Sequence, residues 1–161
     1  MRDTRGQALA EFALVVPLLL FLFLGMVEIG NALAVSHNLS KLSREGANIA
    51  SRGTSLDTVL TVLASTGQDI QLERRGGSVV TRLEVRKKGA VILDQVTTSG
   101  YENESRIGLV GEQTVSLAAS NLQEGSIHYV VEIFYFYRPV TPFARLFENA
   151  METPIYERAL F

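Results

Sequence analysis

Apolar residues follow one another almost without interruption from Ala8 to Val27, where Glu11 is the single charge. A helix that spans a bilayer needs roughly 17 to 25 mainly apolar residues, and this stretch meets that length. Leu, Phe and Val at the centre of such a helix favour insertion into the membrane. The pattern therefore predicts a membrane-spanning helix in the first part of the chain.

The pattern becomes one-sided after Glu28. Apolar and small residues recur every three or four positions from Ile29 to Ile49, and polar residues take the other faces, as in an amphipathic helix. No proline interrupts the stretch from Gln7 to Arg52 except Pro17. We therefore predict one helix of about 40 residues, roughly 60 Å long, which is broken at Gly53 and packs its second half against a globular domain.

A short helix and a hairpin follow in the predicted order. Leu56 to Thr66 predicts a helix that stops at Gly67. Side chains alternate between apolar and polar from Ser78 to Lys87, which is typical of a strand. A tight turn at Lys88-Gly89 leads to a second strand, Ala90 to Thr97, so this region predicts a β-hairpin.

The last third of the chain predicts one strong strand among weaker elements. Thr98 to Gly111 predicts a solvated loop, and Thr114 to Leu122 a short helix. The aromatic and β-branched stretch Ser126 to Arg138 predicts a central strand, with the amphipathic helix on one face and a partner subunit on the other. Thr141-Pro142 is typical of a helix start, and Pro154 to Phe161 of an edge strand. The expected fold class is α+β: a long N-terminal helix packed on a small antiparallel β-sheet.

Length and composition exclude several classes of protein. In 161 residues, one membrane helix leaves room for one small domain. The net charge is −2 with acids and bases intermixed, so the electrostatic footprint of a nucleic-acid binder is missing. There are no cysteines for a disulfide scaffold or a thiolate metal site.

Catalytic motifs are also missing from the sequence. It holds no nucleophile elbow, phosphate loop or metal-binding helix motif. The two histidines, His37 and His128, stand alone, and a lone histidine is more often structural than catalytic. We expect no enzyme activity, no cofactor and no metal.

The charges beside the apolar stretch predict its orientation. Arg2 and Arg5 precede the stretch, and the nearest basic residue after it is Lys41. The positive-inside rule then keeps the N-terminus in the cytoplasm and exports the body of the protein. A secretory signal cut after Ala34 is the rival interpretation, but the apolar stretch is longer than a signal core of 7 to 15 residues.

The residues before and around Glu11 resemble the cleavage site of a prepilin peptidase. The segment is Gly6-Gln7-Ala8-Leu9-Ala10-Glu11-Phe12, preceded by a short basic leader. In such substrates the leader that ends in Gly is removed, and a Glu follows at the fifth position of the mature chain. Cleavage after Gly6 would create an ammonium group at Gln7, with Glu11 four residues further, about 6 Å along a helix. The Glu11 carboxylate could neutralise that ammonium group or the one of a neighbouring subunit.

The first third of the chain is similar to the start of TadE-like proteins, the minor pilins or pseudopilins of tight-adherence pilus systems. The most specific parts of the resemblance are Gly6 with Glu11-Phe12, Pro17, Gly25 with Glu28, and Arg44-Glu45-Gly46-Ala47. The resemblance implies a pilin-like fold with a leader over residues 1–6, a transmembrane and assembly helix over 7–28, and an extracytoplasmic domain over 29–161.

The resemblance also implies partners and a location. They are the inner membrane, a prepilin peptidase, TadF-like and Flp-type pilins, and the pilus assembly platform, with the mature protein in the membrane or in an extracellular pilus. A single-pass membrane anchor that carries an extracytoplasmic binding domain, without a filament role, is the alternative; a secreted enzyme is a distant third.

Pro17 has two interpretations. Proline removes a backbone donor and kinks a helix, so Pro17 could soften the helix where it must pack differently in membrane and filament. It could equally be an ordinary proline of a membrane helix, where neighbours satisfy the freed carbonyl group. The second interpretation is favoured.

Overall fold

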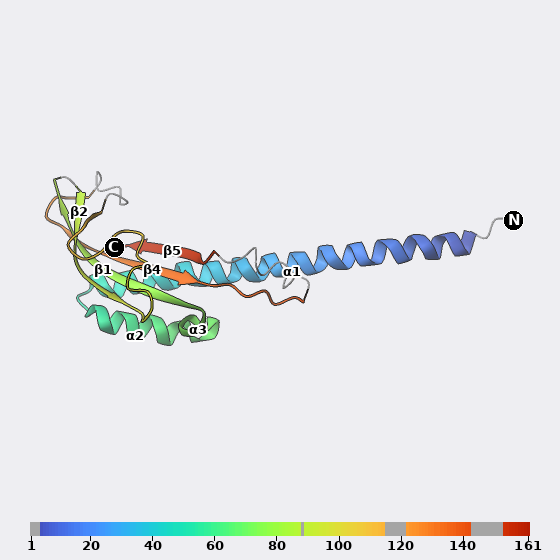
Figure 1. Ribbon diagram of the computed structural model, residues 1–161, viewed down its shortest axis with the longest axis horizontal. Helices are drawn as coiled ribbons and strands as arrows, with labels where there is room; N and C mark the ends of the chain where they lie inside the picture. Colours follow the sequence, from blue (N-terminus) through green and yellow to red (C-terminus); the bar gives the residue numbers. More distant parts are fainter. Residues whose placement is uncertain (1–3, 88, 115–121, 143–152) are drawn as a thin grey trace. The chain divides into compact units, whose positions relative to one another are not determined.

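A computed structural model describes residues 4–87, 89–114, 122–142 and 153–161 of the chain. Helices come first along the chain and strands follow (Figure 1). The strands form one five-stranded antiparallel sheet, and the first helix is by far the longest element. The expected α+β class, with a long N-terminal helix and an antiparallel sheet, is confirmed.

The first helix, α1, is one continuous element from Thr4 to Ser51. It passes through Pro17 and ends just before Gly53, which has φ +90° and so takes a backbone conformation that favours glycine. The predicted break of the helix at Gly53 is therefore confirmed.

Internal contacts divide the chain into two compact units. Unit 1 consists of Met1–Ala34 with Arg138–Glu152, and unit 2 consists of Val35–Tyr137 with Thr153–Phe161. The first part of α1 thus belongs to unit 1 and its last part to unit 2.

The last part of α1 contributes one side to the core of unit 2. Its buried apolar residues are Leu39, Leu42, Ala47 and Ala50, whereas Ile29, at the start of the predicted amphipathic stretch, is exposed. Gly46 lies on the same helix, and a Cβ there would come within 2.7 Å of a methyl carbon of Leu63. The missing side chain therefore lets the next helix approach α1 closely.

That next helix, α2, spans Leu56–Thr66, the predicted bounds. Ser55 caps it, since its hydroxyl group accepts a hydrogen bond from the Thr58 N–H. At Gly67 the chain turns into a short 3-10 helix, η1 (Gly67–Ile70), and then a single helical turn, α3 (Leu72–Arg75). The predicted stop of the α-helix at Gly67 is correct, but these two short turns were not predicted.

The predicted hairpin forms the middle of the sheet. β1 (Gly76–Arg86) pairs antiparallel with β2 (Gly89–Thr97), and Arg86 lies opposite Gly89. Lys88 lies outside the described residues. Gly76 starts β1 where the backbone of β4 comes too close for a side chain, because a Cβ there would lie 2.1 Å from the Phe134 carbonyl oxygen.

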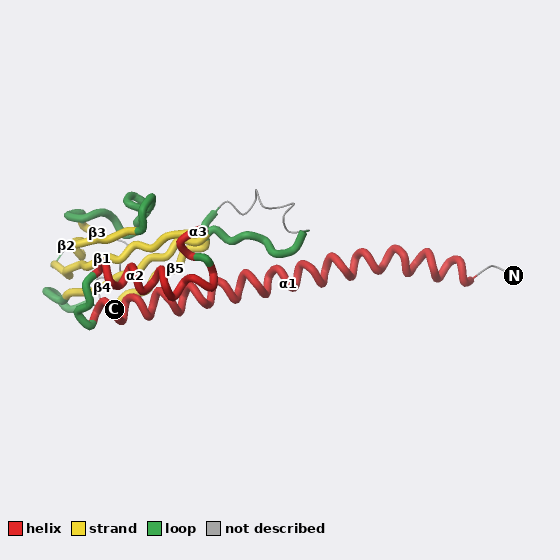
Figure 2. The backbone as a smooth tube through the Cα atoms, turned by 90° about the horizontal axis from the view of Figure 1, so that it is seen from below, coloured by secondary structure: helices red, strands yellow, loops and turns green. Residues whose placement is uncertain are grey.

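The predicted aromatic strand is β4 (Ile127–Tyr135), which lies between β1 and the edge strand β5 (Ile155–Leu160) in the order β3-β2-β1-β4-β5. One face of the sheet packs on α1, α2 and α3 through side chains such as Val80, Val131 and Ile133. Figure 2 shows these helices on one side of the strands. The predicted helix cover on β4 is thereby confirmed, as is the edge strand near the C-terminal end of the sequence.

The opposite face of β4 is covered by the chain's own loop, not by a partner subunit as expected from the sequence. Ile107 is buried in a second apolar cluster with Val130, and the Tyr101 ring lies 5.9 Å from the Phe134 ring. The stretch from Thr98 to Gly111 is therefore a loop, as predicted, but part of it packs on the sheet instead of lying in solvent.

Two other predictions fall at the limits of the described residues. Gln113–Thr114 forms a two-residue strand, β3, which pairs with β2, so the prediction that a helix begins at Thr114 is wrong. The rest of that expected helix, residues 115–121, lies outside the described residues. So does the helix expected after Thr141-Pro142, over residues 143–152.

Candidate functional site

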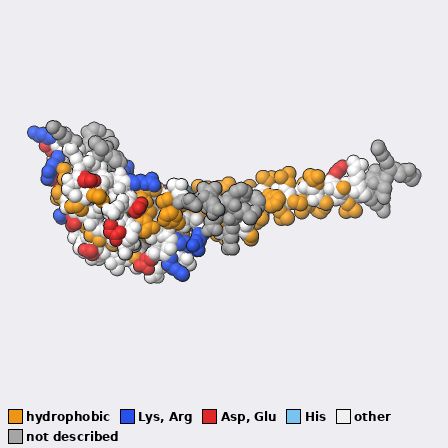
Figure 3. Space-filling view, in the orientation of Figure 1, with side chains coloured by type: hydrophobic (Ala, Val, Ile, Leu, Met, Phe, Trp, Pro, Cys, Tyr) orange, Lys and Arg blue, Asp and Glu red, His pale blue; other side chains and the backbone are white. Residues whose placement is uncertain are grey.

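The first part of α1 presents apolar side chains to its surroundings on every face. Figure 3 shows hydrophobic side chains gathered along this part of the helix. Among its exposed residues, Leu14 keeps 75% and Met26 73% of their surface accessible. By length and composition, α1 is a helix that could cross a membrane. Exposed apolar surface on this scale marks an interaction site for lipid or for other helices.

The predicted processing and assembly residues lie together at the start of this surface. Gly6, Gln7, Glu11 and Phe12 are all exposed on α1. The side-chain amide of Gln7 donates a hydrogen bond of 3.0 Å to the Glu11 carboxylate one helical turn further. The side chains of Gln7 and Glu11 therefore lie on the same side of the helix. The cleavage after Gly6 and the assembly role of Glu11 and Phe12 stay predictions.

Pro17 lies inside α1, five residues beyond Phe12. The helix continues through it, so the missing N–H of this residue does not end the element. Its role as a softened point of the helix stays a prediction.

A buried carboxylate follows at the other end of the apolar surface. Glu28 is only 7% exposed, although its neighbours Val27 and Ile29 are exposed. Its carboxylate accepts hydrogen bonds from the backbone N–H groups of Val140 (3.0 Å) and Thr141 (2.9 Å), and from the Thr141 hydroxyl group (2.8 Å). All of these residues belong to unit 1. We call this arrangement the Glu28 clamp. The sequence marked Glu28 as part of the family resemblance but did not reveal its partners.

A second buried carboxylate, Glu132, lies in the sheet of unit 2, and the sequence patterns did not identify it as a site residue. It is fully buried on β4 and accepts hydrogen bonds from Ser105 Oγ (2.6 Å), the Arg106 N–H (2.9 Å) and Tyr156 Oη (2.7 Å). Burial, followed by the hydrogen bond to Glu132 and its charge, raises the pKa of Tyr156. The sequence signal for this site was Glu132 as the single charge within an aromatic strand, because a buried charge needs hydrogen-bonding partners.

The guanidinium group of Arg106 completes this cluster. It lies 4.2 Å from the centre of the Tyr156 ring and 5.9 Å from that of Phe134, both within the range of cation–π contacts. The cluster ties the loop to β4 and β5 and leaves the Glu132 oxygens engaged with donors. Its arrangement is that of a structural support for the sheet.

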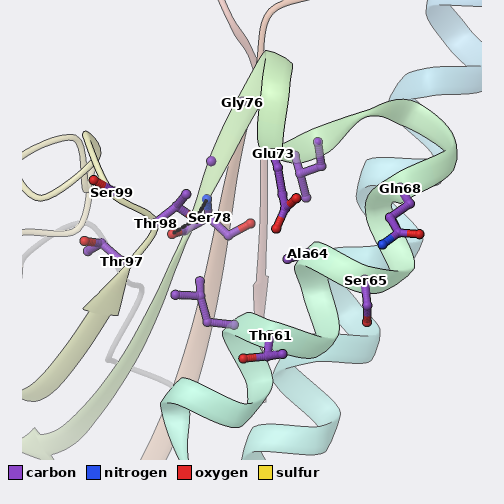
Figure 4. Close-up of a pocket in the computed structure, with 13 residues that line it drawn as sticks. Thr61, Ala64, Ser65, Gln68, Glu73, Gly76, Ser78, Thr97, Thr98 and Ser99 are labelled. Atoms are coloured by element: carbon purple, nitrogen blue, oxygen red, sulfur yellow. Dashed lines mark hydrogen bonds between the residues drawn. The ribbon is translucent and has the colours of Figure 1, made fainter.

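Unit 2 also has an open cleft of about 480 Å³ between α2 and the adjoining ends of β1 and β2. Its lining is mainly apolar and includes Leu60, and Thr61, Ser78 and Thr98 add hydroxyl groups. Figure 4 shows the Glu73 side chain extending toward the space between Ser78 and Ala64. Among the residues described by the structure, no group of three or more His, Asp or Glu side chains is placed to hold a metal ion.

The described elements define a class of protein in which a long N-terminal helix, apolar in its first part, precedes an α+β domain. Comparison with protein families agrees with this: residues 6–48 match the family of TadE-like protein, and the matched segment lies within α1. The resemblance read from the sequence is thus confirmed over these residues. At family level the match relates the chain to minor pilins associated with Tad pili, which are structural proteins and not enzymes. Searches of curated proteins and of solved structures found no match.

Proposed function

We propose that this protein is a minor pilin, or pseudopilin, of a tight-adherence pilus. The observation that carries the proposal is the first part of α1, an apolar helix with exposed side chains on all faces, in which Glu11 is the single charge from Ala8 to Val27. The TadE-like match over the same residues supports it. In this proposal residues 1–6 are the leader, 7–28 the transmembrane and assembly helix, and 29–161 the extracytoplasmic domain.

Maturation precedes assembly. A prepilin peptidase cuts the chain between Gly6 and Gln7 while α1 is in the inner membrane, with the N-terminus in the cytoplasm. The hydrogen bond between the Gln7 and Glu11 side chains supports the pairing that follows cleavage, because both residues lie on the same side of the helix one turn apart. After cleavage, the backbone nitrogen of Gln7 carries a positive charge that the carboxylate can pair with.

During assembly the helix exchanges lipid for other pilin helices. Contacts between apolar helices, including the exposed Phe12, replace contacts with acyl chains, so the transfer changes the neighbours of these side chains without exposing them to water. The Glu11 carboxylate meets an ammonium group, its own or that of a neighbouring subunit, in surroundings of low dielectric where such pairing counts. The proposed partners are TadF-like and Flp-type pilins and the assembly platform.

The alternative is a membrane-anchored binding domain without a filament role. The cleft beside α2 is the observation that favours it, because its size lies within the range of small-molecule sites. In that case the apolar helix serves only as an anchor, and the chemistry of Glu11 does not matter.

Glu11→Ala separates the two functions. In the pilin proposal this variant still inserts and unit 2 still folds, but the number of pili per cell falls sharply because the ammonium group loses its partner. Glu124→Ala is the matched control, since Glu124 is also an exposed glutamate but lies in unit 2, outside the residues that carry the family resemblance. Piliation is counted by electron microscopy in cells that carry each variant as the sole copy. Normal piliation with Glu11→Ala would overturn the proposed assembly role.

A further inference from the structure

The Glu28 clamp holds a segment with no regular secondary structure against α1. Residues 136–142 belong to neither helix nor strand, and Glu28 binds the middle of this segment. Glu28 also marks the end of the uncharged stretch of the helix, where the predicted membrane span over residues 7–28 ends. The clamped segment therefore lies beside the helix where a bilayer surface is expected.

From Pro139 to Pro142, every backbone N–H group of the segment has an acceptor in the clamp. Pro139 and Pro142 have no backbone N–H. The N–H groups of Val140 and Thr141 both donate to the Glu28 carboxylate, as does the Thr141 hydroxyl group. The satisfied donors lower the cost of bringing this irregular backbone to the interfacial region, because each unsatisfied backbone group in hydrocarbon costs several kcal/mol.

The carboxylate gains from the same contacts. A charged side chain near the hydrocarbon region is costly unless it is paired or hydrogen-bonded. The donors from Val140 and Thr141 satisfy the Glu28 carboxylate, and the carboxylate in turn satisfies the backbone N–H groups of this irregular segment. In an aqueous setting neither group would require the other, because water could satisfy both.

The side chain presented by this segment is apolar. The Val140 side chain is 62% exposed. Its neighbours along the chain are Pro139 and Thr141, and Thr141 is held by Glu28. It lies in the same compact unit as the exposed apolar surface of α1, to which Glu28 ties it. An exposed apolar side chain far away in sequence is thus held at the end of the apolar part of α1.

We propose that Pro139–Pro142 is a second membrane contact, in which the Glu28 clamp holds the Val140 side chain in the interfacial region of the bilayer. The partner is the lipid surface itself, at the level of the glycerol groups and the first acyl carbons. The inference rests on the proposed membrane span of α1. It adds that the protein meets the bilayer with two segments, so that release into a filament breaks both contacts.

Fluorescence can test this contact, because the chain has no tryptophan. The full-length chain with Val140→Trp is reconstituted into phosphatidylethanolamine and phosphatidylglycerol vesicles, with or without bromine atoms near the start of the acyl chains. We expect bromine to cause a loss of emission and the lipid to cause a blue shift. Val110→Trp is the matched control, since Val110 is an exposed valine in a loop of unit 2, and no loss is expected there.

A third reporter separates this inference from the proposed function. Leu19→Trp lies in the predicted span, and bromine deep in the acyl chains is expected to quench it. Quenching of Leu19→Trp without quenching of Val140→Trp would overturn the second contact and leave the span intact. If neither Leu19→Trp nor Val140→Trp is quenched, both the predicted span and the second contact are overturned. Equal quenching of Val110→Trp would show that unit 2 lies broadly on the lipid, which would overturn a specific role for the segment.

The role of the clamp is tested in the Val140→Trp background. Glu28→Gln replaces one acceptor oxygen by a donor group, so it should reduce the quenching of Val140→Trp and leave that of Leu19→Trp unchanged. Thr141→Val removes the hydroxyl donor but keeps both backbone N–H donors, so it should have a smaller effect. Unchanged quenching in Glu28→Gln would overturn the role given to this carboxylate.

Discussion

The first and last parts of α1 belong to one continuous helix, but their apolar side chains are exposed in the first part and buried in the last. In unit 1, the large apolar side chains are exposed, as at Leu14 and Met26. In unit 2, the apolar side chains are buried against α2 and the sheet, as at Leu39 and Ala47. Both parts are rich in apolar residues, so composition alone does not distinguish them. What distinguishes them is whether the apolar residues surround the helix or occupy one stripe.

This difference shows that each part depends on a different partner for its stability. The stripe in unit 2 is buried by the chain itself, and the hydrophobic effect acts when that unit folds. The surface in unit 1 is exposed, as Leu14 and Met26 show, and lipid or other helices would stabilise it. The same division applies to its carboxylates: Glu11 is exposed, while Glu28 is buried with donors from its own chain.

The largest effect that separates the two parts is expected from leucine truncation. Leu39→Ala removes a fully buried side chain from the core of unit 2 and should lower the free energy of unfolding by about 2 to 5 kcal/mol. Leu14→Ala, on the same helix, should leave thermal unfolding of unit 2 nearly unchanged. Circular dichroism of the full chain in detergent measures both. Equal losses for the two variants would show that the contrast between the parts of α1 is wrong.

Membrane insertion should show the opposite order: a charge in the first part of α1 should have the larger effect. Leu19→Lys places a cation near the middle of the predicted span and should make insertion less favourable by about 2.5 to 3.5 kcal/mol. Leu33→Lys, a similarly exposed position beyond Glu28, is the control and should change insertion little. The ratio of inserted to non-inserted chains in microsomes gives the comparison. An unchanged ratio for Leu19→Lys would contradict the predicted span.

The smallest effect is expected at the Glu132 cluster, which stabilises only unit 2. Tyr156→Phe removes a hydrogen bond to a buried carboxylate and should cost about 1.5 to 3 kcal/mol at neutral pH. The pKa of Tyr156 is raised in the folded protein, so the stability that depends on the protonated phenol is fully present below the unfolded pKa of about 10 and is lost as the pH rises above it.

The stability difference between Tyr156→Phe and the natural chain should therefore shrink above pH 10. Thermal unfolding at pH 7 and at pH 11 measures it. Tyr129→Phe, on the face of β4 that packs on the helices, is the control. A difference that stays constant between the two pH values would refute this role of the Tyr156 proton.

Local signals predicted most of the elements. The bounds of α2 follow from Ser55 as a cap and Gly67 as a stop, and the turn at Lys88-Gly89 defines the hairpin between β1 and β2. The interior position of β4 follows from apolar residues on both faces. Each of these depends on residues close together in the sequence.

The contacts that the sequence did not predict join distant residues. Glu28 binds residues 112 and 113 positions away, and Glu132 binds Ser105 across 27 positions. A loop with polar composition gave no sign that Ile107 would be buried on the sheet. Periodicity describes which face of an element is apolar, but it does not identify the segment that will cover that face. The donors of the Glu28 clamp follow only from the folded chain.

The mass of the intact protein recovered from its native membrane tests the proposed function most directly. Processing by a prepilin peptidase predicts a mature chain that begins at Gln7, with the leader over residues 1–6 absent and Glu11 four positions from the new ammonium group. N-terminal sequencing of the same sample identifies the first residue independently. A chain that begins at Met1 or at Val35 would contradict the proposal, because Glu11 would then either have no new ammonium group to pair with or be absent from the mature protein.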